Sequence, residues 1–521
     1  MKFNLDNRFT NELPADPILE NTRRQVTNSC FSFVSPKQTK APKLLHCALE
    51  LGKELGLSEK DMKSDTFLNY STGNEIIPNT KPYAMCYGGH QFGNWAGQLG
   101  DGRAINLAEI EHDNLHWTLQ LKGAGETPYS RTADGLAVLR SSIREYLCSE
   151  AMHYLGIPTT RALSLSLTGD QVLRDMLYDG NAAHEPGAIV CRLAPSFLRF
   201  GSFELPASRE DITTLKQLVN YTIKHHYQHL GKPSKQIYLQ FFQEVADKTL
   251  DMIIHWQRVG FVHGVMNTDN LSILGLTIDY GPYGWLEGYD YDWTPNTTDR
   301  QQKRYRYSNQ PNIGLWNLLK LANALYPLIN ETAPLEKILE NYKHQFESKH
   351  QEMFAQKLGL ESHQKNDKEL YDQLESVLHL TETDMTLFFR QLANTSKNDS
   401  PSMALDRIRH SFYVPDAIKD AIKLKWLEWM TSYLKRLQLE SISDSDRKAN
   451  MDKVNPKYVL RNYMSQLAID AAEKGDYTLI DELYTVLKKP YDEQPAFEKW
   501  FQKRPEWARH KVGCSMLSCS S

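Results

Sequence analysis

The chain has few cysteines, no strong excess of charge and no long apolar run, and each absence narrows the possible functions. Only seven cysteines occur in 521 residues and none forms a C-x-x-C pair, which argues against a disulfide framework or a zinc site. A net charge of −4 offers no basic surface for nucleic acid. No apolar run approaches the ~20 residues that span a bilayer, and the N-terminus lacks the apolar core of a secretory signal. We therefore expect a cytoplasmic monomer that binds neither nucleic acid nor membrane.

The length predicts several domains rather than one. Usual domain sizes suggest about three, and 41% apolar with 24% charged residues is ordinary for a globular protein with large cores. Residues 331–500 carry apolar residues at helical spacing, for example from Leu335 to Leu358. The polar stretch from Ser441 to Lys453 interrupts this pattern, and we interpret it as a loop or short linker.

The segment from His263 to Gly281 follows the catalytic-loop pattern of protein kinases. In H-R-D-x-x-x-x-N the Asp lies two residues after the His, and the Asn lies five residues further on. Counting from His263 puts Asn270 at the metal-binding Asn and, after two expected short strands, Asp279-Tyr-Gly281 at the DFG position. The position of the kinase base is Val265, which cannot accept a proton. The sequence therefore keeps groups that hold nucleotide and metal but lacks the usual group that activates a hydroxyl.

Asp269 is the only carboxylate in this loop and the best candidate for a general base. In the alternative interpretation it only caps or braces the loop. The carboxylate of Asp279 and the amide carbonyl of Asn270 predict a Mg²⁺ site, with Mn²⁺ as the alternative, because both ions take oxygen ligands.

Lys122 ends a strictly alternating strand that begins at Trp117, and Gly123-Ala-Gly125 follows it. This is the arrangement of the kinase lysine that holds nucleotide phosphates. A helix follows, and its buried stripe leaves Glu145 able to reach the lysine and fix its flexible ammonium group. Glu150 is the main competitor for that role. Standing alone, such a lysine would be an exposed residue at the end of a strand.

Six glycines lie between residues 88 and 102, and Arg103 follows them. Glycine permits close backbone approach, so such a stretch can hold phosphates, and an arginine can pair with a phosphate through two hydrogen bonds. Arg192 and Arg199 add further positive charge. These two arginines either pair with acidic neighbours or hold the phosphates of a nucleotide in an unusual orientation.

The order of these motifs is that of a two-lobed kinase, so we predict an α+β fold with a protein-kinase-like bilobal core and a mostly helical C-terminal region. The expected segments are an N-terminal extension packed on the core (1–75), an N-lobe (76–190), a C-lobe (191–330), a helical region (331–505) and a cysteine-containing tail (506–521).

Cys514 and Cys519 lie in this tail among Ser and Gly residues, where nothing in the sequence suggests burial. An exposed thiol there is either inert or a site of redox chemistry.

Together these motifs resemble the selenoprotein O family, whose members have a kinase-like fold and were classed as pseudokinases. The matching blocks cover most of the chain, and their combination is specific. They are Tyr87–Gly93, Leu99–Arg103, Leu121–Gly125, Arg131–Gly135, His263–Asn270, Ile278–Gly284 and Asn455–Asn462.

The resemblance implies transfer of AMP from ATP to Ser, Thr or Tyr hydroxyls of proteins, with ATP bound in the reverse of the kinase orientation. It assigns Asp269 as proton acceptor, Asn270 and Asp279 as metal ligands and Glu145 as the partner of Lys122. The implied ATP-binding residues are Gly100, Gly102, Arg103, Lys122, Asp134, Gly135, Arg192, Arg199 and Asp279. Pyrophosphate would leave, and Mg²⁺ and the arginines would neutralise its charge.

Relatives in eukaryotes end in C-x-x-U, and some bacterial ones pair a tail cysteine with a cysteine of the activation segment. The matching region here, Trp293–Asp299, has no cysteine. Cys519 resembles the tail cysteine, and a Cys514–Cys519 pair or a mixed disulfide is the weaker remaining hypothesis.

Other functions stay open at this point. A small-molecule phosphotransferase would need an Asp where Val265 stands. Within nucleotidyl transfer, UMP could replace AMP as the transferred group. A catalytically inactive nucleotide-binding scaffold is disfavoured by the retained Lys122, Glu145, Asn270 and Asp279. The sequence does not identify the protein targets.

Overall fold

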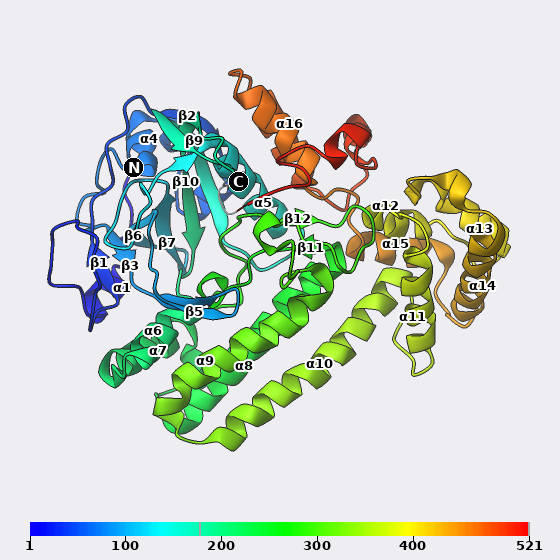
Figure 1. The fold of residues 1–521 in the computed structure, drawn as a ribbon, viewed down its shortest axis with the longest axis horizontal. Coiled ribbons are helices and arrows are strands. Elements are labelled where there is room, and N and C mark those ends of the chain that lie inside the picture. The colour runs from blue at the N-terminus through cyan, green and yellow to red at the C-terminus, as the bar shows by residue number, and fades with distance from the viewer. Residues whose placement is uncertain (177–178, 519–521) are drawn as a thin grey trace.

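A computed structural model describes residues 1–176 and 179–518. The chain combines helices and strands in an α+β arrangement, as predicted (Figure 1). None of the helices in these two ranges has both the length and the apolar character needed to cross a membrane.

An antiparallel sheet of eight strands forms the N-terminal half. Its strands run in the order β1-β3-β6-β7-β10-β9-β2, and the short β8 pairs with β10. Their bounds are β1 Phe31–Phe33, β2 Lys43–Cys47, β3 Tyr83–Met85, β6 Ala104–His112, β7 Leu115–Lys122, β8 Ala137–Val138, β9 Arg161–Arg174 and β10 Ala183–Ala194. The register sets Lys122 opposite both Ala104 and Val190, so the lysine strand lies in the interior of the sheet.

The first helices and a separate hairpin surround this sheet. The helices are α1 Arg8–Glu12, α2 Leu49–Glu54, α3 Glu59–Met62, α4 Asp65–Thr72 and α5 Leu139–Tyr154. The hairpin consists of β4 Gly88–Gln91 and β5 Asn94–Gln98, which pair with each other outside the large sheet. Its strand β5 lies beside the helical half of the molecule (Figure 1).

Long helices form the second half. They are α6 Phe200–Ser208, α7 Ile212–His226, α8 Lys235–Val259, α9 Gln310–Ile329 and α10 Thr332–Leu358. Between α8 and α9 lie the short strands β11 Phe261–Val262 and β12 Gly284–Trp285, which pair with each other, and the 3₁₀ turn η2 Thr268–Asn270. The two short strands expected between Asn270 and Asp279 are reduced to an isolated bridge between Leu271 and Thr277.

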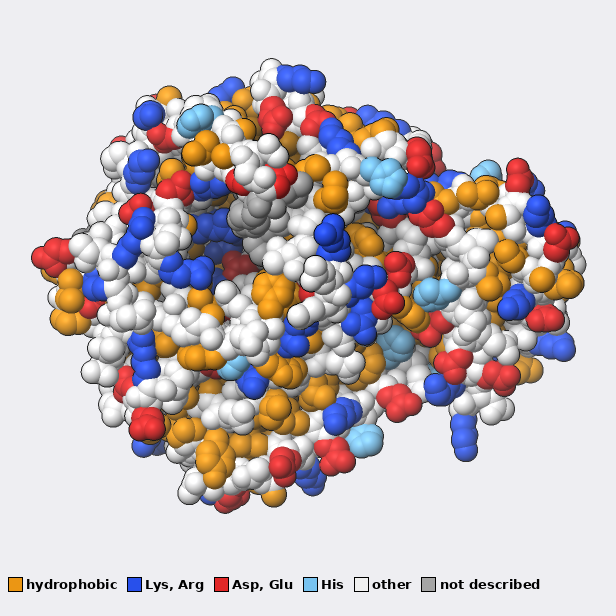
Figure 2. All heavy atoms as spheres, in the orientation of Figure 1, with side chains coloured by type: hydrophobic (Ala, Val, Ile, Leu, Met, Phe, Trp, Pro, Cys, Tyr) orange, Lys and Arg blue, Asp and Glu red, His pale blue; other side chains and the backbone are white. Residues whose placement is uncertain are grey.

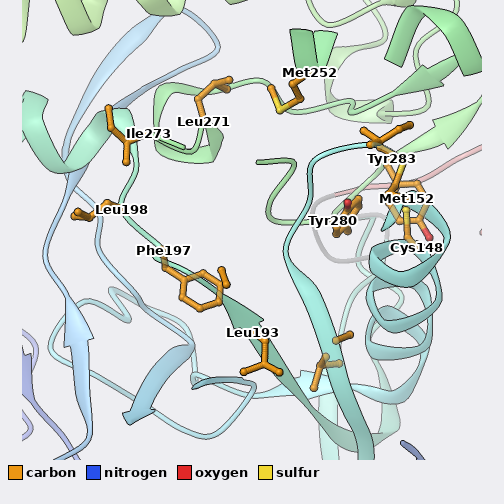
Figure 3. Packing of buried hydrophobic residues seen from close by; sticks show 14 of the residues in the cluster. Cys148, Met152, Leu193, Phe197, Leu198, Met252, Leu271, Ile273, Tyr280 and Tyr283 are labelled. Carbon is orange, nitrogen blue, oxygen red and sulfur yellow. The ribbon is translucent and has the colours of Figure 1, made fainter. Parts of the chain in front are cut away.

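A continuous apolar core joins the sheet to these helices. Leu193 lies near the end of β10 and Phe197 follows the strand. Leu198 packs with Leu271 and Ile273 from the segment after the catalytic loop (Figure 3). This packing fixes the distance between the sheet that carries Lys122 and the loop that carries Asp269.

The remaining helices have a second core. Their bounds are α11 Asp367–Leu378, α12 Met385–Leu392, α13 Pro401–Arg407, α14 Asp420–Leu437, α15 Asp444–Val454, α16 Asn462–Ala472 and α17 Thr478–Leu487. Helices α11 to α15 pack around residues such as Phe388, Trp426 and Trp429. Helices α16 and α17 return to pack on α5 instead.

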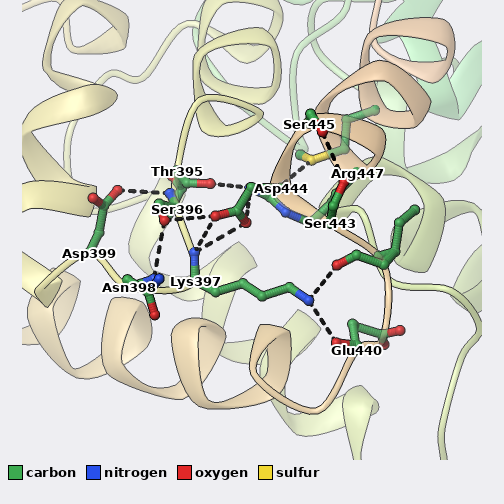
Figure 4. A network of polar contacts seen from close by, with 12 residues as sticks. Thr395, Ser396, Lys397, Asn398, Asp399, Glu440, Ser443, Asp444, Ser445 and Arg447 are labelled. Carbon is green, nitrogen blue, oxygen red and sulfur yellow. Dashed lines mark hydrogen bonds and ion pairs between the residues drawn. The ribbon is translucent and has the colours of Figure 1, made fainter.

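The interpretation of Ser441–Lys453 as a loop or linker is wrong over most of its length, because α15 begins at Asp444. The Ser443 hydroxyl accepts a hydrogen bond from the Asp446 N–H at 3.1 Å and caps the helix. Asp444 also accepts hydrogen bonds from the side chain of Ser396 and the backbone of Lys397 (Figure 4). The helix buries few of its side chains, so its sequence has little of the apolar periodicity from which helices are predicted.

Candidate functional site

A cavity of about 800 Å³ lies between the sheet and the catalytic loop. Figure 2 shows lysine and arginine side chains gathered around a hollow on the face that carries the sheet. Eleven of the predicted site residues line the cavity. They are Gly100, Gly102, Arg103, Lys122, Asp134, Gly135, Arg192, Arg199, Asp269, Asn270 and Asp279.

Lys122 enters the cavity from the end of β7 and pairs with Glu145 of α5. Its Nζ lies 2.6 Å from Oε2 of Glu145, and both side chains are buried. Burial lowers the pKa of Lys122 to about 8. Burial opposes ionisation of Glu145, but Lys122 and Arg192 lower its pKa overall. The competitor Glu150 pairs with Arg161 at 2.8 Å instead.

Arg192 and Arg199 converge on the carboxylate of Asp279. The Nη1 of Arg192 lies 2.9 Å from Oδ1 of Asp279 and 2.8 Å from Oε1 of Glu145. Arg199 pairs with Oδ2 of Asp279 and donates to the backbone oxygen of Asp269 at 2.8 Å. Burial alone would raise the pKa of Asp279, but the two arginines hold it well below its usual range. Arg192 and Arg199 therefore share Asp279 as an acidic partner within the protein.

Asp279 has a left-handed backbone, with φ of +55°. Such a conformation costs energy for a residue other than glycine and is often found at functional sites. Here it belongs to the turn that presents the carboxylate to both arginines.

Asp269 lies in η2 and is only 7% exposed. Burial raises the pKa of its carboxyl to about 6. One oxygen, Oδ2, accepts a hydrogen bond from Nε2 of Gln91 at 3.1 Å. The other, Oδ1, is buried and has no hydrogen-bond partner among the residues that the structure describes. Because Asp269 lines the cavity and its Oδ2 keeps a second lone pair, the carboxylate can accept a proton or hydrogen bond from a ligand.

Asn270 follows Asp269 and faces the same cavity. Its side-chain nitrogen donates to the backbone oxygen of Val265 at 3.0 Å, which leaves the amide oxygen for a ligand. Within the described ranges, no cluster of three or more His, Cys, Asp or Glu residues could hold a metal ion. Asn270 and Asp279 instead offer the small oxygen set that Mg²⁺ uses when nucleotide phosphates complete its coordination.

His263 connects the catalytic loop to the segment that precedes Asp279. Its Nε2 bonds to the backbone oxygen of Ile278 at 2.8 Å, which links the catalytic loop to the Asp279 turn. Burial lowers the pKa of the imidazole and so favours its neutral form.

Gly100 and Gly102 make a tight turn before Arg103. Gly100 has φ of +82°, and a Cβ on Gly102 would lie 2.8 Å from the backbone oxygen of Tyr129. Both positions therefore require glycine. The Arg103 side chain is exposed and has no hydrogen-bond or ion-pair partner within the described part of the chain.

Asp134 and Gly135 also line the cavity. The carboxylate of Asp134 pairs with Arg174 at 2.7 Å and accepts the N–H of Leu136 at 3.0 Å. Burial would raise the pKa of Asp134, but these hydrogen bonds lower it.

Sequence reasoning missed several residues of the cavity. Gln91 and Arg131 line it and lie inside blocks that carry the family resemblance, so their position was a usable signal. The buried Asp101 also lines it and lies inside the block Leu99–Arg103, whereas no spacing or motif distinguishes Arg174 in the sequence.

The prediction that nothing buries Cys514 is wrong. Its side chain is 5% exposed, its backbone oxygen accepts a hydrogen bond from Asn462 at 2.8 Å, and burial raises the pKa of the thiol to about 12. Nearby, Leu517 bridges to Asn296 and ties the tail to the segment before α9. Cys519, and with it the proposed Cys514–Cys519 pair, lies outside the described residues.

Comparison with known proteins identifies close relatives over the full length. The model of the family described as "Protein adenylyltransferase SelO" matches residues 18–488. The chain is 62% identical over 517 residues to the "Protein nucleotidyltransferase YdiU" of Flavobacterium johnsoniae, with 99% of both chains covered. It is 55% identical over 540 residues to the protein of the same name from Rhodopirellula baltica, with 100% of both covered. A third, from Aromatoleum aromaticum, is 52% identical over 523 residues, with 99% of both covered.

Proposed function

Since the chain belongs to the SelO family of protein adenylyltransferases and is a nucleotidyltransferase, we propose that it transfers AMP from ATP to Ser, Thr or Tyr hydroxyls of proteins. The observation that carries this proposal is the pair of opposed carboxylates at the cavity. Asp279 is held ionised by two arginines, and Asp269 is buried, with one oxygen that has no hydrogen-bond partner in the described part of the chain.

In the proposed reaction Asp269 is the general base. The acceptor hydroxyl gives its proton to Asp269 while its oxygen forms a bond to the α-phosphorus of ATP. The bond between that phosphorus and the bridging oxygen breaks, and pyrophosphate leaves with the bonding electrons. Val265 plays no part in proton transfer, so the base differs from that of a kinase by position in the loop.

The cations of the cavity suit this leaving group. Lys122, Arg103 and the pair Arg192 and Arg199 offer more positive charge than a single transferred phosphoryl group requires. We propose that ATP binds reversed relative to kinases, so that these groups hold the β- and γ-phosphates and the α-phosphate lies near Asp269. Gly100, Gly102, Asp134 and Gly135 complete the proposed nucleotide site.

A divalent cation, Mg²⁺ with Mn²⁺ as the alternative, belongs to the proposal. Asn270 and Asp279 would hold it, and the unengaged amide oxygen of Asn270 fits that role. The ion would offset phosphate charge as pyrophosphate departs.

We extend the proposal to the organisation of the chain. The kinase-like core would comprise an N-lobe (76–190) and a C-lobe (191–330), flanked by the extension 1–75, the helical region 331–505 and the tail 506–521. The six cysteines in the described ranges are free thiols, which is typical of a reducing compartment and supports a cytoplasmic location. A monomeric state completes this picture.

Two labels on ATP test the function. Purified protein is incubated with Mg²⁺, an acceptor protein and ATP labelled at either the α- or the γ-phosphate, and protein-bound label is followed. We expect label from the α-position only, and none from the Asp269→Asn variant. Label from the γ-position only would mean phosphoryl transfer and would refute the proposal. Label from the α-position with Asp269→Asn would refute the base assignment alone.

A further inference from the structure

The β4–β5 hairpin reaches from the sheet side of the molecule onto the catalytic loop. Three successive hairpin residues contact three successive loop residues. The contacts are His90 N–H to Oγ1 of Thr268 at 2.7 Å, Gln91 Nε2 to Oδ2 of Asp269 at 3.1 Å, and Phe92 N–H to Oδ1 of Asn267 at 3.1 Å. Hydrogen bonds from both backbone and side-chain groups of the hairpin therefore hold it against the catalytic loop.

Two further features fix the hairpin against Asp269. A Cβ on Gly89 would lie 2.9 Å from Oδ1 of Asp269, so only glycine lets the strand approach this closely. At the tip, the N–H of Phe92 also donates to the hydroxyl of Tyr305 at 3.0 Å, and that hydroxyl donates to Asn267 at 2.6 Å. The hairpin tip is thus anchored independently of the Gln91 side chain.

The two oxygens of Asp269 have different surroundings. Oδ2 is occupied by the Gln91 amide, whereas Oδ1 is buried with no partner among the described residues. The Gln91 amide therefore holds Oδ2 and leaves the second lone pair of that oxygen for a ligand, while the Gly89 backbone packs against Oδ1. The Gln91 amide also restricts rotation of the carboxylate, which has no other side-chain donor within the described ranges.

We propose that Gln91 is a positioning residue for AMP transfer, holding the carboxylate of Asp269 through Oδ2 in the orientation in which it receives the proton of the acceptor hydroxyl. This inference rests on the proposed function, in which Asp269 is the base. As that proton passes to the carboxylate of Asp269, the hydroxyl oxygen bonds to the α-phosphorus and pyrophosphate leaves. Gln91 itself neither gains nor loses a proton.

The test compares one substitution at two glutamines of the same hairpin. Gln91→Met keeps the side-chain length and removes the amide donor. Gln98→Met is the matched control, because Gln98 makes its own hydrogen bonds to Val26 and Arg24, at 2.8 Å each, and does not contact Asp269. Transfer of label from α-labelled ATP to α-casein, a generic acceptor, gives kcat and the KM for ATP.

We expect Gln91→Met to lower kcat about 10- to 100-fold, the usual effect of losing one hydrogen bond to a charged group, with the KM for ATP changed less than twofold. Gln98→Met should change kcat less than threefold. Gln91→Glu should be slower than Gln91→Met, because its carboxylate opposes that of Asp269. Equal kcat values for Gln91→Met and Gln98→Met would overturn the positioning role while leaving AMP transfer intact. A wild-type protein that transfers no AMP would overturn the proposed function itself.

Discussion

Replacing Asp269 or Asp279 by asparagine should abolish AMP transfer, but the two substitutions should change stability in opposite directions. Asp279 is the acidic partner of two buried arginines, Arg192 and Arg199. Removing one partner from a buried ion pair usually costs about 3–5 kcal/mol, because the remaining charge is left uncompensated. Asp279→Asn should therefore lower the free energy of unfolding by an amount of that order.

Asp269 has the opposite balance. Burial raises its pKa from 3.8 to about 6, so above pH 6 the folded protein carries a carboxylate that it would hold more easily as a neutral group. A difference of about 2 pKa units corresponds to about 3 kcal/mol. Asp269→Asn removes this cost and should raise the free energy of unfolding by up to that amount at pH 8.

Urea unfolding at pH 8, without nucleotide or divalent cation, measures both variants against the wild type. A shift of the midpoint without a change of slope gives the stability difference. If Asp279→Asn is as stable as the wild type or more so, the arginines do not depend on Asp279 and the electrostatic account of the cavity is wrong. If the Asp269→Asn variant is less stable than the wild type, the Asp269 carboxylate of the wild type has more favourable interactions than its one side-chain hydrogen bond indicates.

Three further outcomes are expected from other residues. Arg103→Ala should raise the KM for ATP about tenfold or more, because an arginine can pair with a phosphate through two hydrogen bonds. The urea midpoint should not change, because the side chain is exposed and makes no ion pair within the described ranges. An unchanged KM would exclude Arg103 from the nucleotide site. Burial raises the pKa of Glu109 from 4.5 to about 8, so the stability that its protonated form contributes is fully present below pH 4.5 and is lost as pH rises through 8. Glu109→Gln should therefore flatten the fall in unfolding free energy between pH 5 and 9, and an unaltered fall would contradict this. Cys514 should resist alkylation by iodoacetamide in the native protein at pH 8 and react after denaturation, as mass spectrometry would detect, whereas rapid native labelling would show that the tail opens.

The sequence predicted those parts of the site that depend on local patterns. Alternation along β7 put Lys122 at the end of a strand, and the stripe on α5 put Glu145 within reach of it. Kinase-like spacing brought Asn270 and Asp279 to one cavity. These residues are set by the period of a strand or helix, or by a short loop of fixed length.

The contacts that sequence reasoning missed join distant segments. Gln91 and Asp269 are 178 residues apart, and their hydrogen bond depends on how a hairpin outside the large sheet lies over the catalytic loop. The burial of Cys514 likewise depends on Asn462 and on packing that no local pattern encodes. α15 escaped prediction for a different reason, because a helix that buries few of its side chains has little periodicity to detect.

Because Arg192 and Arg199 both form ion pairs with Asp279, any anion that binds these arginines competes with a carboxylate of the protein. A phosphate that binds Arg192 and Arg199 would displace a carboxylate that already pairs with them. The affinity of the phosphate for these arginines would then be the difference between two ion pairs, and it would stay moderate even though each pair is strong. In the proposed reaction, release of pyrophosphate would return the carboxylate of Asp279 to the two arginines.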